Sequence, residues 1–378
     1  MNLLKDEAFK KIVLIFLVSK IIILAAGYGG YFLIPAETTS RQYITDNPLT
    51  NPWAQFDGNA YLDIAKNGYN PDFIGLGNYG WFPLYPLMIR ALSFIGYDFA
   101  ALLIANVFSF LAVIMLYLIV KVEAPKITKK TAFYLLFFPT AYFLTAMYAE
   151  SVFLFFSLAT FYYARKSMWT HAGAFGFFAA LARPQGLLMI LPLVYLYLEE
   201  IKFKISNVRL NAICLLLVPL GTALFVFYIY QLTGDPVGAA QKIFSAHGKT
   251  FSMPWTTFIN EYNNFLAASE LKAYAWILFN GFIAVSLIVL SALSFKWLRK
   301  DYAIYLSLST LLPLLSGSLE GISRYALVLF PAFMLLSMIE ERHKKIGLGI
   351  KLLYVLFFIM LIVLTIRHVN MHLDPYGL

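Results

Sequence analysis

Long apolar runs, separated by short polar segments, follow one another along most of the chain. A helix needs about 20 predominantly apolar residues to cross the hydrocarbon layer of a membrane, and lipid offers its backbone groups no other hydrogen-bond partners. Each long run is therefore a candidate span. We predict about eleven transmembrane helices, over residues 12–34, 99–120, 131–147, 149–164, 169–182, 185–198, 210–231, 273–295, 302–316, 325–340 and 346–366.

Composition supports the same class of protein. Of 378 residues, 61% are apolar and only 13% are charged, against roughly a quarter charged in globular proteins. We expect an all-α polytopic membrane protein, with residues 1–378 forming a single integral membrane domain. The first run is longer than the apolar region of a signal peptide, so we interpret it as a retained anchor. The single cysteine, Cys214, excludes an intrachain disulfide and a cysteine cluster.

The distribution of Lys and Arg predicts the orientation, because short basic loops remain on the cytoplasmic side. With the N-terminus inside and the C-terminus outside, eighteen basic residues lie in the inner segments and nine on the outer face: Arg41, Lys66, Arg90, Arg183, Lys242, Lys249, Lys272, Arg324 and Arg367. The net charge of +9 is spread along the chain without a basic helix or an aromatic and basic motif. We therefore expect no nucleic-acid partner.

Two long segments lie on the less basic, outer side, at residues 35–97 and 233–272. Both are rich in Trp, Tyr, Pro, Gly and acidic residues, a composition that favours structure packed on the membrane surface over disorder. Because the inner loops are short, we expect the function to reside in these outer segments. The protein would then act from the non-cytoplasmic face of the cell membrane, or of the endoplasmic reticulum if the source is eukaryotic.

The first outer segment contains a short predicted helix that begins at Asp57. Ala60, Tyr61, Ile64 and Ala65 fall on one face at helical spacing, and Gly68 is a candidate C-terminal cap. One interpretation is that Asp57 only caps this helix and that Asp63 is solvated. The other is that Asp57 is a general base at the membrane interface.

The sequence from Gly80 to Pro86 places Pro83 and Pro86 among Trp81, Phe82 and Tyr85. Two prolines three residues apart predict a bend, since proline interrupts a regular helix. An aromatic belt at the interface is sufficient to explain the Trp and Tyr residues. The Phe-Pro pair returns at Phe138-Pro139 and Phe330-Pro331.

Ionisable residues near predicted spans are candidate functional groups, because charge is unfavourable in lipid. Glu150, Arg183 and Arg324 all lie at outer ends of spans. Arginines that reach toward headgroups and Glu-Arg ion pairs are the alternative interpretations. An anionic phosphate carried on a lipid would find its guanidinium partners at the same ends. Lys20 lies in the middle of the first span, and we expect it to face a partner or the bundle interior.

Taken in order along the chain, six of these motifs resemble the PIG-V type mannosyltransferases. The matching segments are Phe56-Asp57-Gly58 to Tyr69, Trp81 to Pro86, Phe137 to Ser151, Ala182-Arg183-Pro184 with Gly186, Gly234-Asp235-Pro236, and Ser323-Arg324-Tyr325 to Pro331. Phe56 stands where that family pattern would place Trp, and the chain is short for a eukaryotic member, so a prokaryotic source is expected.

The resemblance implies a GT-C bundle whose first outer loop bears short amphipathic helices, and a glycosyltransferase that takes a sugar, mannose in that family, from a polyprenyl-phosphate donor. The acceptor would be a lipid or a glycan, the reaction would invert the anomeric centre, and no cofactor or metal is expected. Asp57 would be the catalytic base. The expected substrate-binding or phosphate-binding residues are Arg183, Arg324, Glu150, Asp63, Asp235, Lys242, Lys249, Tyr325, Trp81 and Tyr85.

A secondary transporter or a lipid flippase is the main alternative, since either would also have many spans. Transporters usually carry repeated halves and charges near the midplane, and this sequence has neither beyond Lys20. A scaffold subunit without chemistry would explain the hydrophobicity but not the acids and arginines grouped on one side.

Overall fold

The computed structural model describes residues 5–35, 42–246 and 248–371, and these ranges contain helices, turns and irregular segments but no strand. The predicted all-α class is therefore confirmed. Arg41, counted above among the outer basic residues, lies outside the described residues.

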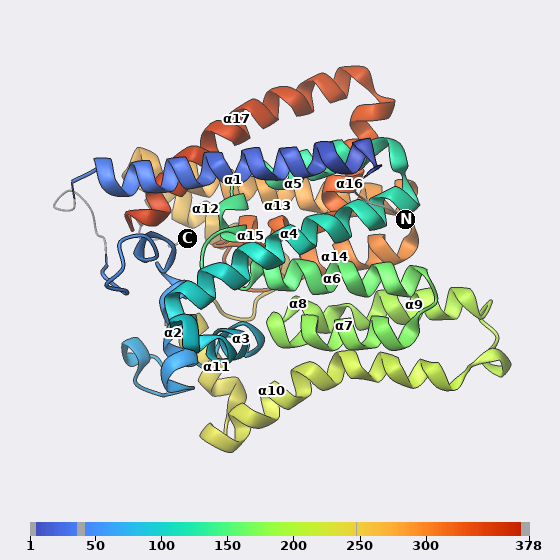
Figure 1. Ribbon diagram of the computed structural model, residues 1–378, viewed down its shortest axis with the longest axis horizontal. Coiled ribbons are helices and arrows are strands. Elements are labelled where there is room, and N and C mark those ends of the chain that lie inside the picture. The colour runs from blue at the N-terminus through green and yellow to red at the C-terminus, as the bar shows by residue number, and fades with distance from the viewer. Residues whose placement is uncertain (1–4, 36–41, 247, 372–378) are drawn as a thin grey trace.

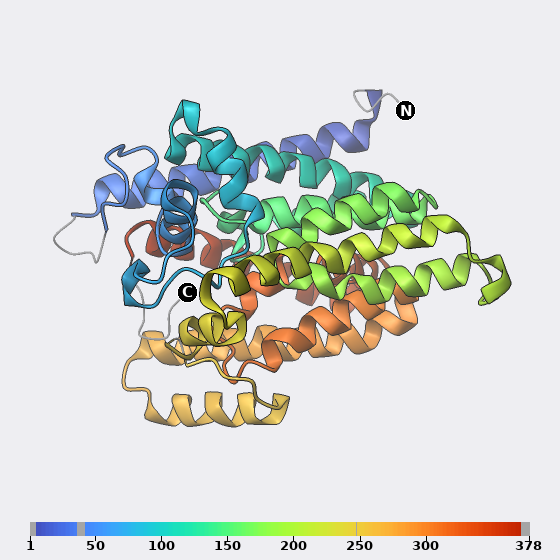
Figure 2. The ribbon, with the colours of Figure 1, turned by 90° about the horizontal axis from the view of Figure 1, so that it is seen from below.

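Within the part of the chain that the structure describes, five long helical segments form the frame, and each is long and apolar enough to cross a membrane. They run along the longest axis of the structure (Figures 1 and 2). The protein is thus membrane-embedded. The five segments are α1 (Glu7–Leu33), α4 (Tyr97–Glu123), a 3₁₀ segment (Leu210–Leu216) continued by α10 (Leu217–Thr233), α13 (Leu271–Trp297) and α17 (Lys344–Val369).

Shorter helices fill the space between these five. The longest has 16 residues, which corresponds to about 24 Å and falls short of the roughly 30 Å hydrocarbon layer. None of these shorter helices is therefore long enough to cross the whole hydrocarbon layer on its own. They are α5 (Thr128–Leu136), α6 (Glu150–Arg165), α7 (Trp169–Ala182), α8 (Gln185–Leu188), α9 (Ile190–Glu200), α14 (Lys300–Leu314), α15 (Ile322–Leu327) and α16 (Phe330–Arg342).

The prediction of one continuous helix over residues 131–147 is wrong. Helix α5 ends at Leu136, and the chain then passes through turns and a single 3₁₀ turn (Ala141–Leu144) before α6 begins. Pro139 explains the break, because it has no N–H to donate and its ring clashes with the preceding turn of a helix. Residues 137–149 are nevertheless completely buried.

Lys20 stabilises this buried irregular segment. Its ammonium group donates to the Leu144 carbonyl at 2.7 Å, to Thr145 Oγ1 at 2.8 Å and to Asn106 Oδ1 at 3.1 Å. Irregular backbone is tolerated at membrane depth only where protein groups satisfy it. Lys20 therefore faces the bundle interior, which was one of the two environments expected for it.

Two other predicted spans are divided in the structure. The range 185–198 forms α8 and α9, which meet at Met189, and the range 325–340 is divided between α15 and α16. Pro331 is in the first turn of α16, the position where proline starts a helix rather than continuing one. Pro331 thus sets the start of α16.

The two ends of the bundle differ in character. At one end, helices finish among basic residues that form ion pairs, such as Arg165 with Glu123 and Arg299 with Glu199. We call this the basic end. At the other end the chain from residue 42 to residue 96 folds into short elements (Figure 1), among them α2 (Asp57–Asn67) and α3 (Leu84–Ala91). Helices α11 (Pro236–Ala246) and α12 (Pro254–Ala267) connect α10 to α13.

Candidate functional site

Asp57 is the first residue of α2, and the backbone before it has an unusual conformation. Phe56 has a φ of 56°, a left-handed value that is rare for a bulky residue. The Phe56 ring packs against His368, with ring centroids 5.4 Å apart. The predicted amphipathic helix is confirmed, because Ala60, Ile64 and neighbouring residues are buried and Gly68, at a φ of 82°, ends the helix. This turn directs Asp57 into a cavity.

Pro184, the residue after Arg183, determines the backbone conformation of Arg183. A residue before proline is disfavoured in the α conformation, and Arg183 is extended, with φ −157° and ψ 155°, at the end of α7. Its guanidinium group forms an ion pair with Glu150, donates to Gln185 Oε1 at 3.2 Å and lies 5.5 Å from the centre of the Tyr325 ring.

Gly186 permits this turn. A Cβ atom at that position would lie 2.4 Å from the backbone of Ala179, closer than any side chain could be accommodated. Glycine at residue 186 thus lets the chain pass directly against α7, which keeps Arg183 facing the bundle interior.

Arg324 reaches the same place from α15. Gly321, at a φ of 76°, precedes this helix. The Arg324 guanidinium group lies 4.7 Å from the centre of the Phe143 ring and 4.8 Å from that of Tyr148. These contacts are typical of cation-π interactions. Both rings come from the buried irregular segment before α6.

Glu150 joins the two arginines. It is the first residue of α6 and is fully buried. Its Oε1 accepts from Nε and Nη2 of Arg324 at 2.9 and 2.7 Å, and it also pairs with Arg183. Nη1 of Arg324 lies 2.8 Å from Oδ2 of Asp57. Two carboxylates and two guanidinium groups from four helix ends therefore form one connected network, and such pairing is what allows buried charges to persist.

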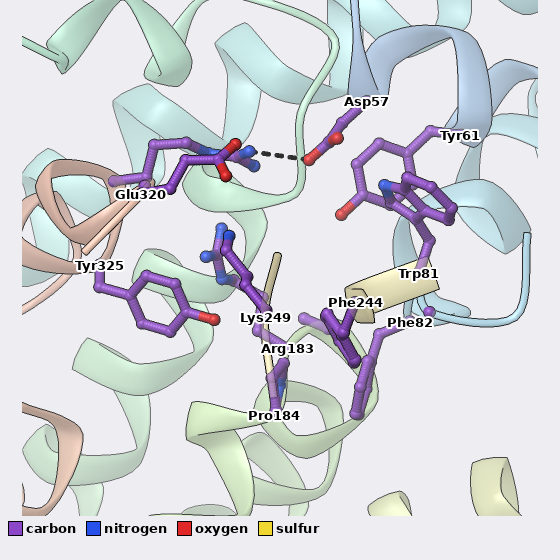
Figure 3. A pocket seen from close by; sticks show the side chains of 14 residues that line it. Asp57, Tyr61, Trp81, Phe82, Arg183, Pro184, Phe244, Lys249, Glu320 and Tyr325 are labelled. Carbon is purple, nitrogen blue, oxygen red and sulfur yellow. Dashed lines mark ion pairs between the residues drawn. The ribbon is translucent and has the colours of Figure 1, made fainter. Parts of the chain in front are cut away.

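An open cavity, of about 930 Å³ with the open solvent at its mouth included, lies against this network. Figure 3 shows Asp57, Tyr61 and Trp81 on one side of it and Glu320 and Tyr325 on the other. Its charged lining residues are three cations and two acids, which favours an anionic occupant. The cavity is lined by Asp57, Tyr61, Gly80, Trp81, Phe82, Ala182, Arg183, Pro184, Phe244, Lys249, Glu320, Gly321, Arg324 and Tyr325.

The pKa of Asp57 reflects two opposing effects. Burial raises the pKa of this carboxyl, whereas the Arg324 guanidinium lowers it, and the net result is a pKa below the ordinary value. Asp57 is consequently ionised at neutral pH. A hydrogen bond from Trp81 acts in the same direction as Arg324.

A second cavity, of about 820 Å³ with open solvent included, lies next to the first. The two are lined by neighbouring residues, since Phe82 and Ala182 line the first while Pro83 and Leu181 line the second. Its lining is mostly apolar, with Arg90 as the charged member, and comprises Ile64, Gly68, Tyr69, Pro83, Pro86, Leu87, Arg90, Leu181, Leu224, Phe225 and Tyr228. Helix α10, one of the five long apolar segments, forms part of this wall.

The structure brings most of the sequence-predicted site residues together. Trp81, Arg183, Lys249, Arg324 and Tyr325 line the first cavity with Asp57, and Glu150 lies buried behind them.

The other predicted site residues lie elsewhere. Asp63 accepts from the side chains of Asn67, Asn70 and Asn78 and so organises the loop after α2. Tyr85 is buried beside Tyr61 and donates to the Ala101 carbonyl. Asp235 accepts from the Gly238 N–H at the start of α11, and Lys242 is exposed on that helix.

Sequence analysis did not single out Tyr61, Phe244 or Glu320 as site residues, although all three line the cavity. Tyr61 was assigned to the buried face of α2, and nothing in its spacing distinguishes a cavity wall from a packing contact. Glu320 could have been found, because it lies four residues before Arg324. His368, which the sequence analysis did not discuss, does not line the cavity and is buried among Phe56, Tyr142, Phe143 and Tyr148.

Within residues 5–35, 42–246 and 248–371, no group of three or more His, Cys, Asp or Glu side chains could hold a metal ion. The cationic side chains that line the first cavity are Arg183, Lys249 and Arg324. Asp63 accepts hydrogen bonds from Asn70 and Asn78, and Glu150 forms its ion pair with Arg183.

The fold and the site together define a helical membrane protein with a buried carboxylate and guanidinium network beneath an open cavity. No known family model matches the chain. No curated protein matches it either.

Proposed function

We propose that this protein is a membrane glycosyltransferase that transfers a sugar, mannose in the family it resembles, from a polyprenyl-phosphate donor to a hydroxyl of a lipid or glycan acceptor. The observation that carries the proposal is the position of Arg324, which bonds to Asp57 and Glu150 at once in the wall of the cavity. A carboxylate and a set of cations in one cavity are the two kinds of group that such a transfer requires.

The proposed reaction is an inverting displacement at the anomeric carbon. The acceptor oxygen forms a bond to that carbon while the bond from carbon to the phosphate oxygen breaks, so that polyprenyl phosphate leaves with the bonding electrons. Asp57 takes the proton of the acceptor hydroxyl. Arg183, Arg324 and Lys249 stabilise the negative charge that develops on the departing phosphate. The proposal needs no cofactor.

The lowered pKa of Asp57 makes it a weak base in the resting site. A bound phosphate would compete for the Arg324 guanidinium group, and burial would then raise the pKa of Asp57 with less opposition. Donor binding would in this way increase the basicity of the carboxylate at the time it is needed. This replacement of Asp57 by phosphate as the partner of Arg324 also explains why an enzyme would hold its base and its phosphate-binding arginine in contact before the substrate arrives.

The apolar second cavity supports a lipid-linked substrate, because it offers a place for an isoprenoid chain beside the polar site. We further propose a GT-C bundle of about eleven crossings, counting the shorter helices that pack between the five long ones. The site would face away from the cytoplasm, since the basic end is opposite to it. In a prokaryote that position corresponds to the outer side of the cell membrane.

The proposal can be tested with purified protein in lipid vesicles. The protein is incubated with radiolabelled polyprenyl-phosphate-mannose and a set of lipid and glycan acceptors, and released polyprenyl phosphate and labelled product are separated and counted. Release that requires both an acceptor and the Asp57 carboxylate supports the proposal. Labelled donor that crosses the bilayer without release would instead identify a flippase.

A further inference from the structure

Helix α12 lies in a segment that the sequence presents only as a long loop, and its two faces differ in chemistry. Thr257, Asn260 and Glu261 point toward the protein, where they form hydrogen bonds. The opposite face exposes large apolar and aromatic side chains at helical spacing: Trp255 at 64%, Ile259 at 54%, Tyr262 at 62% and Leu266 at 62%.

The polar face of α12 holds the turn that connects α14 to α15. Thr257 Oγ1 donates to the Leu314 carbonyl at 2.7 Å and accepts from the Gly317 N–H at 3.1 Å. Asn260 Nδ2 donates to the Gly317 carbonyl at 2.9 Å, and Glu261 Oε1 accepts from the Leu319 N–H at 2.7 Å. This turn leads directly to Gly321 and Arg324 of the site.

The length of α14 indicates how deep in the membrane that turn lies. Helix α14 begins at the basic end, and its 15 residues rise about 22 Å, less than the hydrocarbon thickness of about 30 Å. Leu314 and the following turn therefore lie within the leaflet on the side of the site, and any tilt of the helix would place them deeper. Backbone at that depth has to be satisfied by protein groups, and the polar face of α12 supplies them.

The apolar face of α12 continues a surface that already faces lipid. Figure 2 shows α12 alongside the first part of α13, separate from the centre of the bundle. The two helices contact each other through Phe265 and Tyr274, with ring centroids 4.9 Å apart. Helix α13, one of the five candidate spans, exposes Leu278 and Phe282 on its outer surface.

We propose that the N-terminal half of α12 is immersed in the leaflet on the side of the site, with Trp255 and Ile259 against the acyl chains. Tyr262 and the exposed Asn263 lie farther along the helix and reach the headgroup region, where a Tyr ring and a polar amide are favourable. α12 thus joins the bilayer to the turn that precedes Arg324. This proposal is independent of the reaction assigned to the site.

Site-directed spin labelling tests the proposal directly. In a Cys214→Ser background, single cysteines replace Trp255 or Ile259, and each is labelled with a nitroxide in the full-length protein in lipid vesicles. Collision rates with oxygen, which concentrates in lipid, and with a water-soluble nickel chelate are then measured. Leu278→Cys on α13 provides the lipid-facing control, and Glu270→Cys in the turn between α12 and α13 provides the water-facing control.

We expect the ratio of oxygen to nickel collision rates at residues 255 and 259 to match that at residue 278 and to be several-fold higher than that at residue 270. Ratios equal to that at residue 270 would overturn the proposal, because they would place the face in water. Exclusion of both reagents, with an immobilised label, would also overturn it and would indicate a protein partner.

Discussion

Glu150 accepts two hydrogen bonds from Arg324, at 2.9 and 2.7 Å, although the two residues are 174 positions apart in the sequence. Glu150 begins α6 and Arg324 lies in α15, so the pair joins the two halves of the chain at the base of the cavity. The same guanidinium group also binds Asp57. The arrangement of the site therefore depends on this pair of residues.

The first prediction concerns this pair. Arg324→Gln should lower the free energy of unfolding by about 3–5 kcal/mol, because it leaves Glu150 as a buried charge with reduced compensation. Glu150→Gln should also destabilise the protein, since it deprives both arginines of their shared partner. The free energy of unfolding should fall less in the double variant than the sum of its decreases in the two single variants. Unfolding temperatures in one detergent measure the effect, and strictly additive losses would contradict it.

Asp57→Asn should lower kcat for sugar transfer by about 10²–10⁴-fold, the usual contribution of a positioned base, while the protein remains folded. The amide keeps the size of the side chain but has far less affinity for a proton. Asp63→Asn is the matched control, because Asp63 lies on the same helix and binds amides outside the cavity. Normal turnover by Asp57→Asn would exclude the base assignment.

Two lysines of the second outer segment allow a controlled test of phosphate binding. Lys249 lines the cavity, whereas Lys242 is exposed on α11 and does not line it. Lys249→Gln should raise the KM for the lipid-phosphate donor about tenfold, equivalent to roughly 1.4 kcal/mol. Lys242→Gln should leave KM unchanged. Equal effects of the two substitutions would indicate a general charge effect of the surface instead.

The expected pH dependence of sugar transfer follows from the lowered pKa of Asp57. A carboxyl with a depressed pKa in the folded protein is ionised above its unfolded value of about 3.9, and its ion pair is lost only as the pH falls through the lower folded value. We therefore expect kcat/KM to show no loss attributable to Asp57 between about pH 7 and pH 5. An acidic decline centred near pH 6 that shifts in Asp57→Glu would contradict this.

Lys20→Met should destabilise the protein by about 1–3 kcal/mol, because the buried Leu144 carbonyl would lose its donor. The irregular segment over residues 137–149 also carries the Phe143 and Tyr148 rings that pack on Arg324, so turnover should fall as well. Ile21→Met, one residue away on the exposed surface of α1, is the control and should change neither quantity. Thermal unfolding and sugar release are the two measurements.

Much of the fold could be predicted from local pattern. The apolar runs correspond to helices, and Gly68 ends α2 as its position predicts. The sequence also grouped Asp57, Glu150, Arg183 and Arg324 on one side of the membrane, because alternating spans return the chain to the same face. The break after α5 was not predicted, since residues 137–149 are apolar enough to resemble a span and hydropathy does not register the effect of Pro139.

Hydropathy and proline positions by themselves determine that this protein is helical, that it is embedded in a membrane and where several helices end. Both are properties of a residue and its neighbours along the chain. Only the tertiary structure decided that Arg324 binds Asp57 and Glu150, that Lys20 satisfies Leu144, and that α12 has a polar side facing the turn before Arg324. Each of these depends on the packing of distant helices, because a buried charge or an unpaired carbonyl is stabilised by whichever partner the packing brings within reach.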